Sequence, residues 1–385
     1  MVKFHLKNKT ILLISPQKWS KMHVSKHHYA IELARKGNKV YFLNPMNKGF
    51  GYNISPIPDH DNLFLLNLNY SFAFHFHSWF LFHLFIRIIL LYISKKNKIK
   101  FDIIWNFSHQ MFSNYRFFNY AFKIYQPMDA IDYSFDKTVA KNSDIIISIS
   151  DPIIQKFSQI NRPKLLINHG LSNLFEKQAR LNLEHYNYFR PEKPKIGFTG
   201  NLLFYGLDFE SYKSVISENQ DCLFIFWGPY KLNNTAYRGN RLKEEVDNFI
   251  GFLQNQNNVN LKGIVSQDIL LNEMQDIDIF TAFYMENNHV NKSANSHKLL
   301  EYLSTGKVIV TNYISMYKKH SDIIRMSQAN QNNKIPAIFK DTLNNLEFYN
   351  NIEKSKERIS FALNNTYSNQ ISIIEDHINN YYFKS

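Results

Sequence analysis

The hydrophobic positions of the chain gather into short apolar runs that alternate with longer amphipathic stretches. A first group of runs covers residues 10–15, 39–45, 101–107, 144–150 and 164–168, and a second group covers 195–201, 222–228, 259–263, 278–283 and 307–312. Continuous runs of β-branched and aromatic residues are typical of strands buried on both faces of a parallel sheet. Because helical stretches separate the runs, the pattern predicts an α/β fold with doubly wound sheets.

Two such sheets are expected rather than one. The polar, proline-bearing segment 186–195 separates the two groups of strands, and 385 residues exceed one ordinary hydrophobic core. We therefore predict two Rossmann-like domains facing across a cleft, formed by residues 1–190 and 191–355. A helical tail over 356–385 is expected to pack back on the first domain. Ligands of open parallel sheets bind beyond the carboxyl ends of the strands, so candidate residues are sought directly after them.

Residues 71–100 form the most apolar segment of the chain. The run is about long enough to span a bilayer, but three histidines and Arg87 interrupt it, and lysines 95, 96, 98 and 100 follow it. A spanning helix is therefore not expected. Two interpretations stay open: a segment lying on an anionic membrane, or a buried helix of the first domain with a solvated end.

The net charge limits the classes of partner that we expect, and the cysteine content limits the cellular compartment. The formal net charge of +13 favours an anionic partner such as a phosphate-bearing small molecule or a membrane surface. No nucleic-acid-binding module is present, so nucleic acid is not expected. The single cysteine, Cys222, lies in an apolar run and is expected to be buried. It excludes a disulfide framework, and the N-terminal residues do not fit a signal peptide. We expect a cytoplasmic protein, which would be associated with the inner face of the plasma membrane under the first interpretation of residues 71–100.

The segment 295–312, NSHKLLEYLSTGKVIVTN, combines a short helix with a strand. Asn295 or Ser296 is expected to cap the helix, and Gly306 to end it in the left-handed conformation. Lys298 and Glu301 are three residues apart and share one helix face. The helix start and Lys298 favour a diphosphate, and the carboxylate of Glu301 can accept hydrogen bonds from two vicinal hydroxyls of a ribose. The pattern suits a nucleoside diphosphate.

Several segments resemble, in order along the chain, those of GT-B glycosyltransferases of the family 4-like (group 1) type. Residues 298–312 resemble the K-L-x-E-Y-L-A-x-G-x-P-V-V signature of their second domain. Other matching segments are 10–45, 165–175, 194–202, 223–230 and 258–280. The resemblance implies a GT-B fold and a nucleotide-sugar donor, with Glu301 on the donor ribose and Lys298 and Ser296 near the diphosphate. In the commonest retaining subfamily a second glutamate occurs at the position of Ser293, so retention and inversion both stay open.

Further donor-binding residues follow other predicted strands. Gly200, Asn201 and Gly228 are expected to bring backbone N–H groups close to phosphate, because glycine has no side chain. His169 ends a strand at the domain border and is also assigned to the donor. The chain contains no G-x-G-x-x-G motif or P-loop, which argues against dehydrogenases and NTPases.

The acceptor side is assigned to residues 15–30, SPQKWSKMHVSKHHYA. Ser25 is expected to cap the helix that begins near Lys26. His23 and His27 are candidates for catalysis as base or oxyanion partner. Trp19, Ser25 and His28 are candidates for acceptor binding.

Two acidic pairs complete the candidates. Asp129 and Asp132 lie in a proline-bearing loop after a strand, so Asp129 is a candidate base and Asp132 a candidate acceptor contact. Asp276 and Asp278 form an Asp-x-Asp triplet that we interpret as structural. No carboxylate or cysteine is spaced to complete a histidine metal site, so no metal and no cofactor other than the donor substrate are expected.

These observations predict a metal-independent glycosyltransferase of hexosyltransferase type. It would transfer a sugar from a nucleotide-diphosphate donor to a glycan or lipid-linked acceptor in cell-surface polysaccharide synthesis. The alternatives are a nucleotide-sugar epimerase of the same fold and a non-catalytic sugar-nucleotide binding protein.

Overall fold

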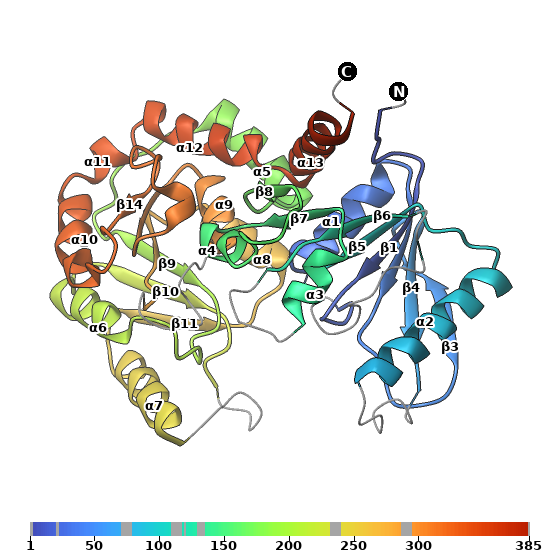
Figure 1. Ribbon diagram of the computed structural model, residues 1–385. Helices are drawn as coiled ribbons and strands as arrows, with labels where there is room; N and C mark the ends of the chain where they lie inside the picture. Colours follow the sequence, from blue (N-terminus) through green and yellow to red (C-terminus); the bar gives the residue numbers. More distant parts are fainter. Residues whose placement is uncertain are drawn as a thin grey trace. The chain divides into compact units, whose positions relative to one another are not determined.

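The chain folds into two compact units, each built on one sheet. The computed structural model describes residues 3–20, 23–70, 79–108, 118, 121–128, 135–231, 240–285 and 295–383 (Figure 1). Unit 1 comprises Met1–Gly170 and Tyr367–Ser385, and unit 2 comprises Leu171–Thr366.

Unit 1 contains an eight-stranded sheet in the order β3-β4-β2-β1-β5-β6-β7-β8. All neighbours are parallel except β3 and β4. The strands are β1 (Thr10–Ile14), β2 (Lys39–Leu43), β3 (Tyr52–Pro56), β4 (Leu63–Leu68), β5 (Ile103–Asn106), β6 (Phe122–Tyr125), β7 (Ile145–Ser148) and β8 (Lys164–Leu166). The helices are α1 (Ser25–Arg35), α2 (Trp79–Lys96), α3 (Asp136–Lys141), α4 (Asp151–Gln155) and α13 (Tyr367–Tyr382).

Helices cover both faces of this sheet. Ile11 and Leu13 of β1 belong to a cluster with α1 and α13, whereas Leu12 and Ile14 belong to a second cluster with α2. Alternate residues of a strand point to opposite faces, so the continuous apolar run of β1 serves two cores. This is the physical basis of the predicted doubly wound sheet.

Unit 2 contains a six-stranded, all-parallel sheet in the order β11-β10-β9-β12-β13-β14. The strands are β9 (Lys195–Thr199), β10 (Leu223–Trp227), β11 (Val259–Gly263), β12 (Ile279–Ala282), β13 (Val308–Thr311) and β14 (Arg325–Met326). The helices are α5 (Asn173–His185), α6 (Phe209–Glu218), α7 (Asn240–Gln254), α8 (Gln267–Met274), α9 (Lys298–Leu303), α10 (Ile335–Asn344), α11 (Leu346–Tyr349) and α12 (Ile352–Asn364), with short 3-10 turns at Ser315–Tyr317 and Asn332–Lys334.

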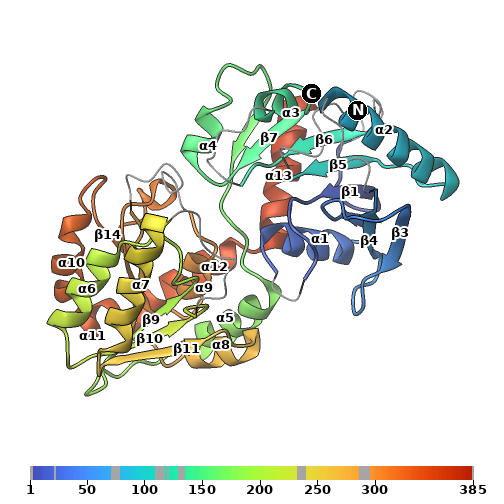
Figure 2. The same cartoon turned by 90° about the horizontal axis from the view of Figure 1, so that it is seen from below.

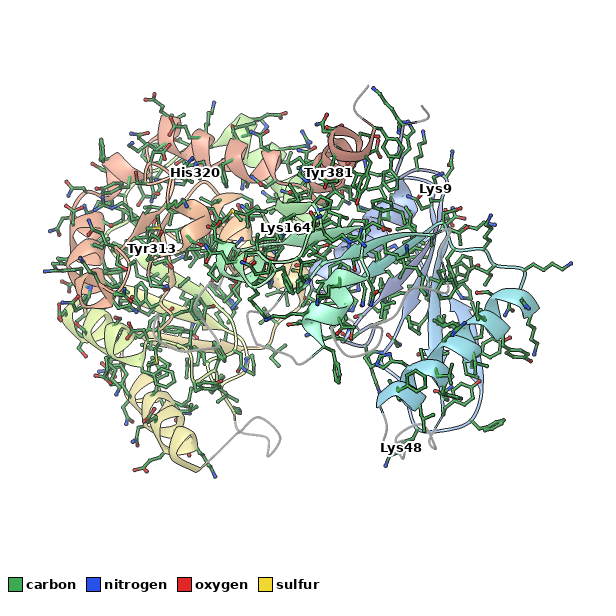
Figure 3. All side chains as sticks on the ribbon, in the orientation of Figure 1. Lys9, Lys48, Lys164, Tyr313, His320 and Tyr381 are labelled. Carbon is green, nitrogen blue, oxygen red and sulfur yellow. The ribbon has the colours of Figure 1, made fainter. Side chains whose placement is uncertain are left out.

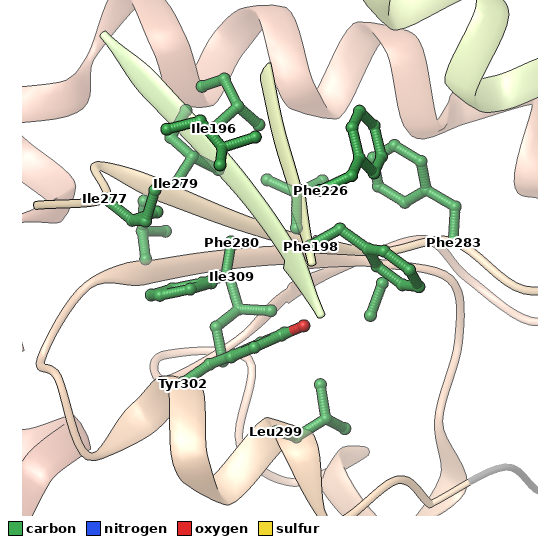
Figure 4. Close-up of a cluster of buried hydrophobic side chains, with 14 of the residues drawn as sticks. Ile196, Phe198, Phe226, Ile277, Ile279, Phe280, Phe283, Leu299, Tyr302 and Ile309 are labelled. Carbon is green, nitrogen blue, oxygen red and sulfur yellow. The ribbon is translucent and has the colours of Figure 1, made fainter. Parts of the chain in front are cut away.

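The core of unit 2 fixes α9 against the sheet. Figure 4 shows Tyr302 and Leu299 of α9 beside Phe198 of β9 and Phe280 of β12. The ring of Tyr302 stacks on that of Phe280, with centroids 4.2 Å apart. Its hydroxyl accepts a hydrogen bond of 2.8 Å from the backbone N–H of Thr199, so one buried side chain ties the helix to the end of β9.

The last two helices of the chain belong to different units. In α12, the buried Arg358 donates to the backbone oxygens of Gly306, Ile323 and Tyr349, all in unit 2. By contrast, α13 buries Ile371, Ile374 and Ile378 in the unit 1 core; Figure 2 shows it beside α1. The division between units therefore lies at 170/171 and 366/367, not at the predicted 190/191 and 355/356. In the first case the reason is α5, whose Phe175 and Ala179 pack in the unit 2 core.

All ten predicted strands are present, and four further strands were not predicted. These are β3, β4, β6 and β14. The residues of β4 lead directly towards the apolar segment 71–100, which conceals their boundary in the sequence, and β14 has only two residues. Cys222 is buried, as expected, and burial raises the pKa of its thiol to about 11.

Candidate active site

The predicted donor residues of unit 2 come together where β9 and β10 end. A Cβ atom on Gly228 would collide with the backbone oxygen of Gly200, and a Cβ on Gly200 would collide with Nζ of Lys298. Gly228 also has a φ of +132°, which favours glycine. The absence of side chains at both positions lets the two loops and Lys298 approach one another.

The expected role of these glycines as phosphate-binding amides needs correction. The N–H of Gly200 donates to the oxygen of Trp227 at 2.7 Å, and the N–H of Gly228 donates to the oxygen of Gly263 at 2.8 Å. Both groups continue the sheet pairing beyond the strand ends, so they are not free to bind phosphate. Asn201 is exposed, and its Oδ1 accepts a hydrogen bond from the N–H of Leu203 at 3.0 Å.

Lys298 lies at the centre of this edge of the sheet. Its Nζ is 3.3 Å from the hydroxyl of Tyr284 and 5.2 Å from the ring centroid of Phe198. None of the carboxylates that the structure describes forms a salt bridge with it. A half-buried ammonium group held by an aromatic face and a phenol is a suitable partner for an anion.

Glu301 lies one turn further along α9, on the same helix face as Lys298. Its side chain is 17% exposed and lies 3.9 Å from Nε2 of His297. Burial raises the pKa of its carboxyl group to about 7, and the nearby charge of Lys298 only partly opposes this. Its carboxylate accepts no hydrogen bond from the part of the chain that the structure describes. Because the side chain is only half-buried, its carboxylate is accessible and can accept hydrogen bonds from an external donor.

The start of α9 differs from the prediction. The N-cap residue is His297, and no side chain caps the helix. Ser296 instead contributes its backbone oxygen, which accepts from the N–H of Leu299 at 3.1 Å. At the other end, Gly306 has a φ of +79° and ends the helix in the predicted left-handed conformation.

Tyr284 and Tyr302 are site residues that the sequence analysis missed. Tyr284 follows the predicted strand 278–283 directly, so its position after a strand was the available signal. Tyr302 gave no such signal, because a tyrosine on an apolar helix face is usually a core residue.

In unit 1, the predicted acceptor residues form an aromatic cluster around Trp19. The Trp19 ring lies edge-on to Phe42 and His27, at centroid distances of 5.0 and 5.2 Å, and 5.1 Å from His23. Its backbone N–H donates to Oδ1 of Asn44 at 2.8 Å. Trp19 therefore anchors the loop after β1 while part of its ring stays accessible.

His27 has a structural role in this loop. Its Nδ1 accepts from the N–H of Val24 at 3.1 Å, and its Nε2 lies 3.1 Å from the oxygen of Lys18. Burial lowers its pKa to about 4. Because both ring nitrogens are engaged and the ring is buried, the structure argues against the predicted role of His27 as a catalytic base.

Ser25 and His169 interact with each other rather than in their predicted roles. The helix N-cap is Val24, and Oγ of Ser25 lies 2.9 Å from Nδ1 of His169. Both side chains are buried in unit 1. This pair joins the start of α1 to the loop after β8. Ser25 therefore does not cap the helix, and the ring of His169 contacts Ser25 where a donor contact was predicted.

His23 and His28 are the more accessible histidines of this loop. Both are half-buried, and no hydrogen bond to their rings occurs among the described residues. Burial lowers the pKa of His23, and it lowers that of His28 to about 3. His28 stacks on Tyr367 with centroids 5.1 Å apart. Burial therefore favours the neutral form of both rings.

The acidic candidates divide between described and undescribed residues. Asp129, Asp132 and Ser293 lie outside the described residues. Asp278 is buried, and its carboxylate accepts from the N–H of Lys195 at 2.7 Å, which confirms its predicted structural role. Within the described ranges, no three His, Cys, Asp or Glu side chains gather as metal ligands would.

The fold has clear counterparts among solved structures. A trehalose 6-phosphate synthase from Burkholderia multivorans aligns with a TM-score of 0.70 and 7% identity, covering 97% of this chain and 99% of that one. A sucrose-phosphate synthase from Thermosynechococcus elongatus aligns with a TM-score of 0.67 and 9% identity, covering 98% of this chain and 100% of that one. HepE from Anabaena, in complex with UDP and glucose, aligns with a TM-score of 0.62 and 11% identity, covering 97% of this chain and 99% of that one. At these identities the likeness shows the fold, and it confirms the predicted GT-B class.

Sequence comparisons add nothing to this likeness. No protein-family model matches the chain, and no curated protein sequence matches it.

Proposed function

We propose that this chain is a glycosyltransferase that takes a sugar from a nucleoside diphosphate donor bound to unit 2. The observation that carries the proposal is the pair Lys298 and Glu301 on one face of α9, at the edge where two glycines make room. An ammonium group without a carboxylate salt bridge suits the diphosphate, and a half-buried carboxylate that accepts no hydrogen bond from the described residues suits the two ribose hydroxyls.

The likeness to solved structures supports the same donor class. HepE has been solved with UDP and glucose, and a trehalose-6-phosphate structure from E. coli holds UDP-2-fluoro glucose. We therefore propose a UDP-hexose as the first donor to test. The acceptor is proposed to be a glycan or a lipid-linked glycan of cell-surface polysaccharide synthesis.

The described residues suggest how the reaction is promoted without a metal. Breaking the bond between sugar and diphosphate leaves negative charge on the departing phosphate, and Lys298 supplies a positive charge that meets it. The hydroxyl of Tyr284, 3.3 Å from Nζ, holds that ammonium in place. Of the histidines in unit 1, we assign acceptor contact to His23 and His28, because His27 is engaged at both nitrogens.

Calorimetric titration with UDP- and GDP-sugars tests the donor proposal. Glu301→Ala removes the ribose acceptor, and we expect affinity to fall about 10- to 100-fold, as for lost hydrogen bonds to a charged group. Lys298→Ala should cause a loss of similar size. Glu210→Ala and Lys213→Ala remove an exposed ion pair on α6 of the same unit and should leave affinity unchanged.

The outcomes separate the alternatives. Equal binding by wild type and both α9 variants would contradict the proposal. Conversion of donor without any acceptor would indicate an epimerase, and binding without turnover in the presence of glycan acceptors would indicate a binding protein.

A further inference from the structure

Helix α2 has an apolar outer face in addition to the inner face that joins the unit 1 core. On the inner side Ile86, Leu90 and Ile93 are fully buried. On the opposite side Leu81, Ile88 and Tyr92 are 47%, 54% and 50% exposed. Their spacing of seven and four residues places them in one line, about 16 Å long at the rise of an α-helix.

The outer face of α2 lies at the margin of unit 1. Figures 1 and 2 show α2 on the side of the sheet away from α1 and α13. Ring contacts link α2 to the loop before β3, through the buried ring of Tyr70. Phe50 is 88% exposed and lies 6.1 Å from Tyr70, whose ring is 5.2 Å from Phe85 of α2.

Positive charge adjoins this apolar face. Lys95, Lys96, Lys98 and Lys100 are exposed at and just beyond the end of α2, and no acidic residue occurs between Asp61 and Asp102. Nζ of Lys96 lies 5.7 and 5.6 Å from the ring centroids of Tyr52 and Tyr92, which holds a cation at the edge of the apolar line. Lys48, two residues before Phe50, also projects from the margin of the unit (Figure 3).

We propose that the outer face of α2, together with Phe50, binds the surface of an anionic lipid bilayer. Exposed apolar side chains enter the boundary between headgroups and acyl chains, and flanking lysines pair with anionic headgroups. A purely charged partner such as nucleic acid would not use the apolar line. In the described part of the chain, no helix has the length and hydropathy of a membrane span.

Vesicle co-sedimentation tests the proposal with the whole protein. We expect binding to vesicles of phosphatidylcholine with phosphatidylglycerol and little binding to phosphatidylcholine alone. Lys95→Ala with Lys96→Ala should weaken binding about tenfold or more, since each lysine near an anionic surface contributes about fivefold. Ile88→Ser with Tyr92→Ser should also weaken it, although the charge is unchanged.

Unit 2 offers a matched control. Phe348 is 58% exposed and lies under Nζ of Lys354 at 4.9 Å, so Phe348→Ser with Lys354→Ala removes the same kind of pair elsewhere. This variant should bind vesicles like the wild type. Equal loss in this variant and in the α2 variants, or no binding to anionic vesicles at low salt, would overturn the proposal.

A fluorescent label tests whether α2 itself meets the lipid. The native Cys222 is buried, so Ile88→Cys provides a selective labelling site. An environment-sensitive dye at this position should shift to shorter wavelength with anionic vesicles, whereas a dye on Ile352→Cys in unit 2 should not. A shift at Ile352 alone would contradict the assignment. Donor binding by unit 2 does not enter this test, so the two proposals fail separately.

Discussion

At the scale of single residues, the candidate site depends on two half-buried charged groups, Glu301 and Lys298. Glu301 carries a carboxylate in a setting that disfavours its charge, and Lys298 lies one turn away with its ammonium group over the ring of Phe198. Such an arrangement costs stability in the free protein. It is the kind of cost that functional residues commonly bear, because the missing hydrogen bonds are supplied by a ligand.

The raised pKa of Glu301 predicts a pH-dependent donor affinity. The ionised carboxylate accepts hydroxyl hydrogen bonds, and with a pKa of about 7 its ionised fraction rises steeply from pH 6 to pH 8. Affinity for a UDP-sugar should therefore rise about tenfold over this range, since only the ionised form binds well. Calorimetric titration at several pH values measures this.

Glu301→Gln is the control for this pH effect. Glutamine keeps the shape but does not titrate, so the variant should bind weakly with little pH dependence. The stability of the ligand-free protein should change with pH in the opposite direction to the donor affinity. A raised carboxyl pKa makes the folded state hold its proton, so this contribution to stability is present below about pH 4.5 and is lost as pH rises through 7. An identical pH dependence of affinity in wild type and variant would refute the role of Glu301.

At the scale of elements, the loops after β9 and β10 and the short helix α9 act as one assembly. The backbone of each loop continues the sheet by hydrogen bonds from Gly200 and Gly228, and Tyr302 ties α9 to Thr199. The position of Lys298 is thus set by backbone packing across three elements. A change in the loop should act on donor binding although it touches no ligand.

Two glycine substitutions test this dependence on backbone packing. Gly228→Ala places a Cβ on the oxygen of Gly200 at a φ of +132°, so we expect a loss of about 1 to 3 kcal/mol of unfolding free energy together with weaker donor binding. Gly251→Ala lies within α7, where a Cβ meets nothing within 4 Å. It should raise stability by about 0.5 to 1 kcal/mol. Urea unfolding distinguishes the two, and equal effects would show that the loop contact is unimportant.

At the scale of the whole molecule, the C-terminal helix completes unit 1. Helix α13 packs Ile371, Ile374 and Ile378 beside α1. The N–H of Phe4 donates a hydrogen bond to Oδ1 of Asn379 at 2.8 Å, and the N–H of Leu6 donates to Oε2 of Glu375 at 2.7 Å. Residues 4–6 and α13 are therefore joined within unit 1.

Neighbouring isoleucines of α13 test this closure. Ile374 is fully buried and Ile373 is 43% exposed. Ile374→Ala should cost about 2 to 5 kcal/mol, whereas Ile373→Ala should cost little. Hydrogen–deuterium exchange should show lost protection in α1 and α13 for Ile374→Ala, with α6 and α10 of unit 2 unchanged. Loss of protection confined to unit 2 would contradict the assignment of α13.

The sequence by itself determined much of the architecture of this protein. Apolar runs with no polar alternation specify strands buried on both faces, and ten of them identify two parallel sheets. The spacing of Lys298 and Glu301 determines that they share a helix face, because that relation is local to one turn.

Only the tertiary structure decided which candidate residues have polar groups available to a ligand. The N–H groups of Gly200 and Gly228, both nitrogens of His27 and the hydroxyl of Ser25 are taken by partners on other segments. Packing likewise decided that α5 belongs to unit 2 and α13 to unit 1. Hydrogen bonds and apolar contacts between distant segments leave no periodic trace in the sequence, so these assignments required the folded chain.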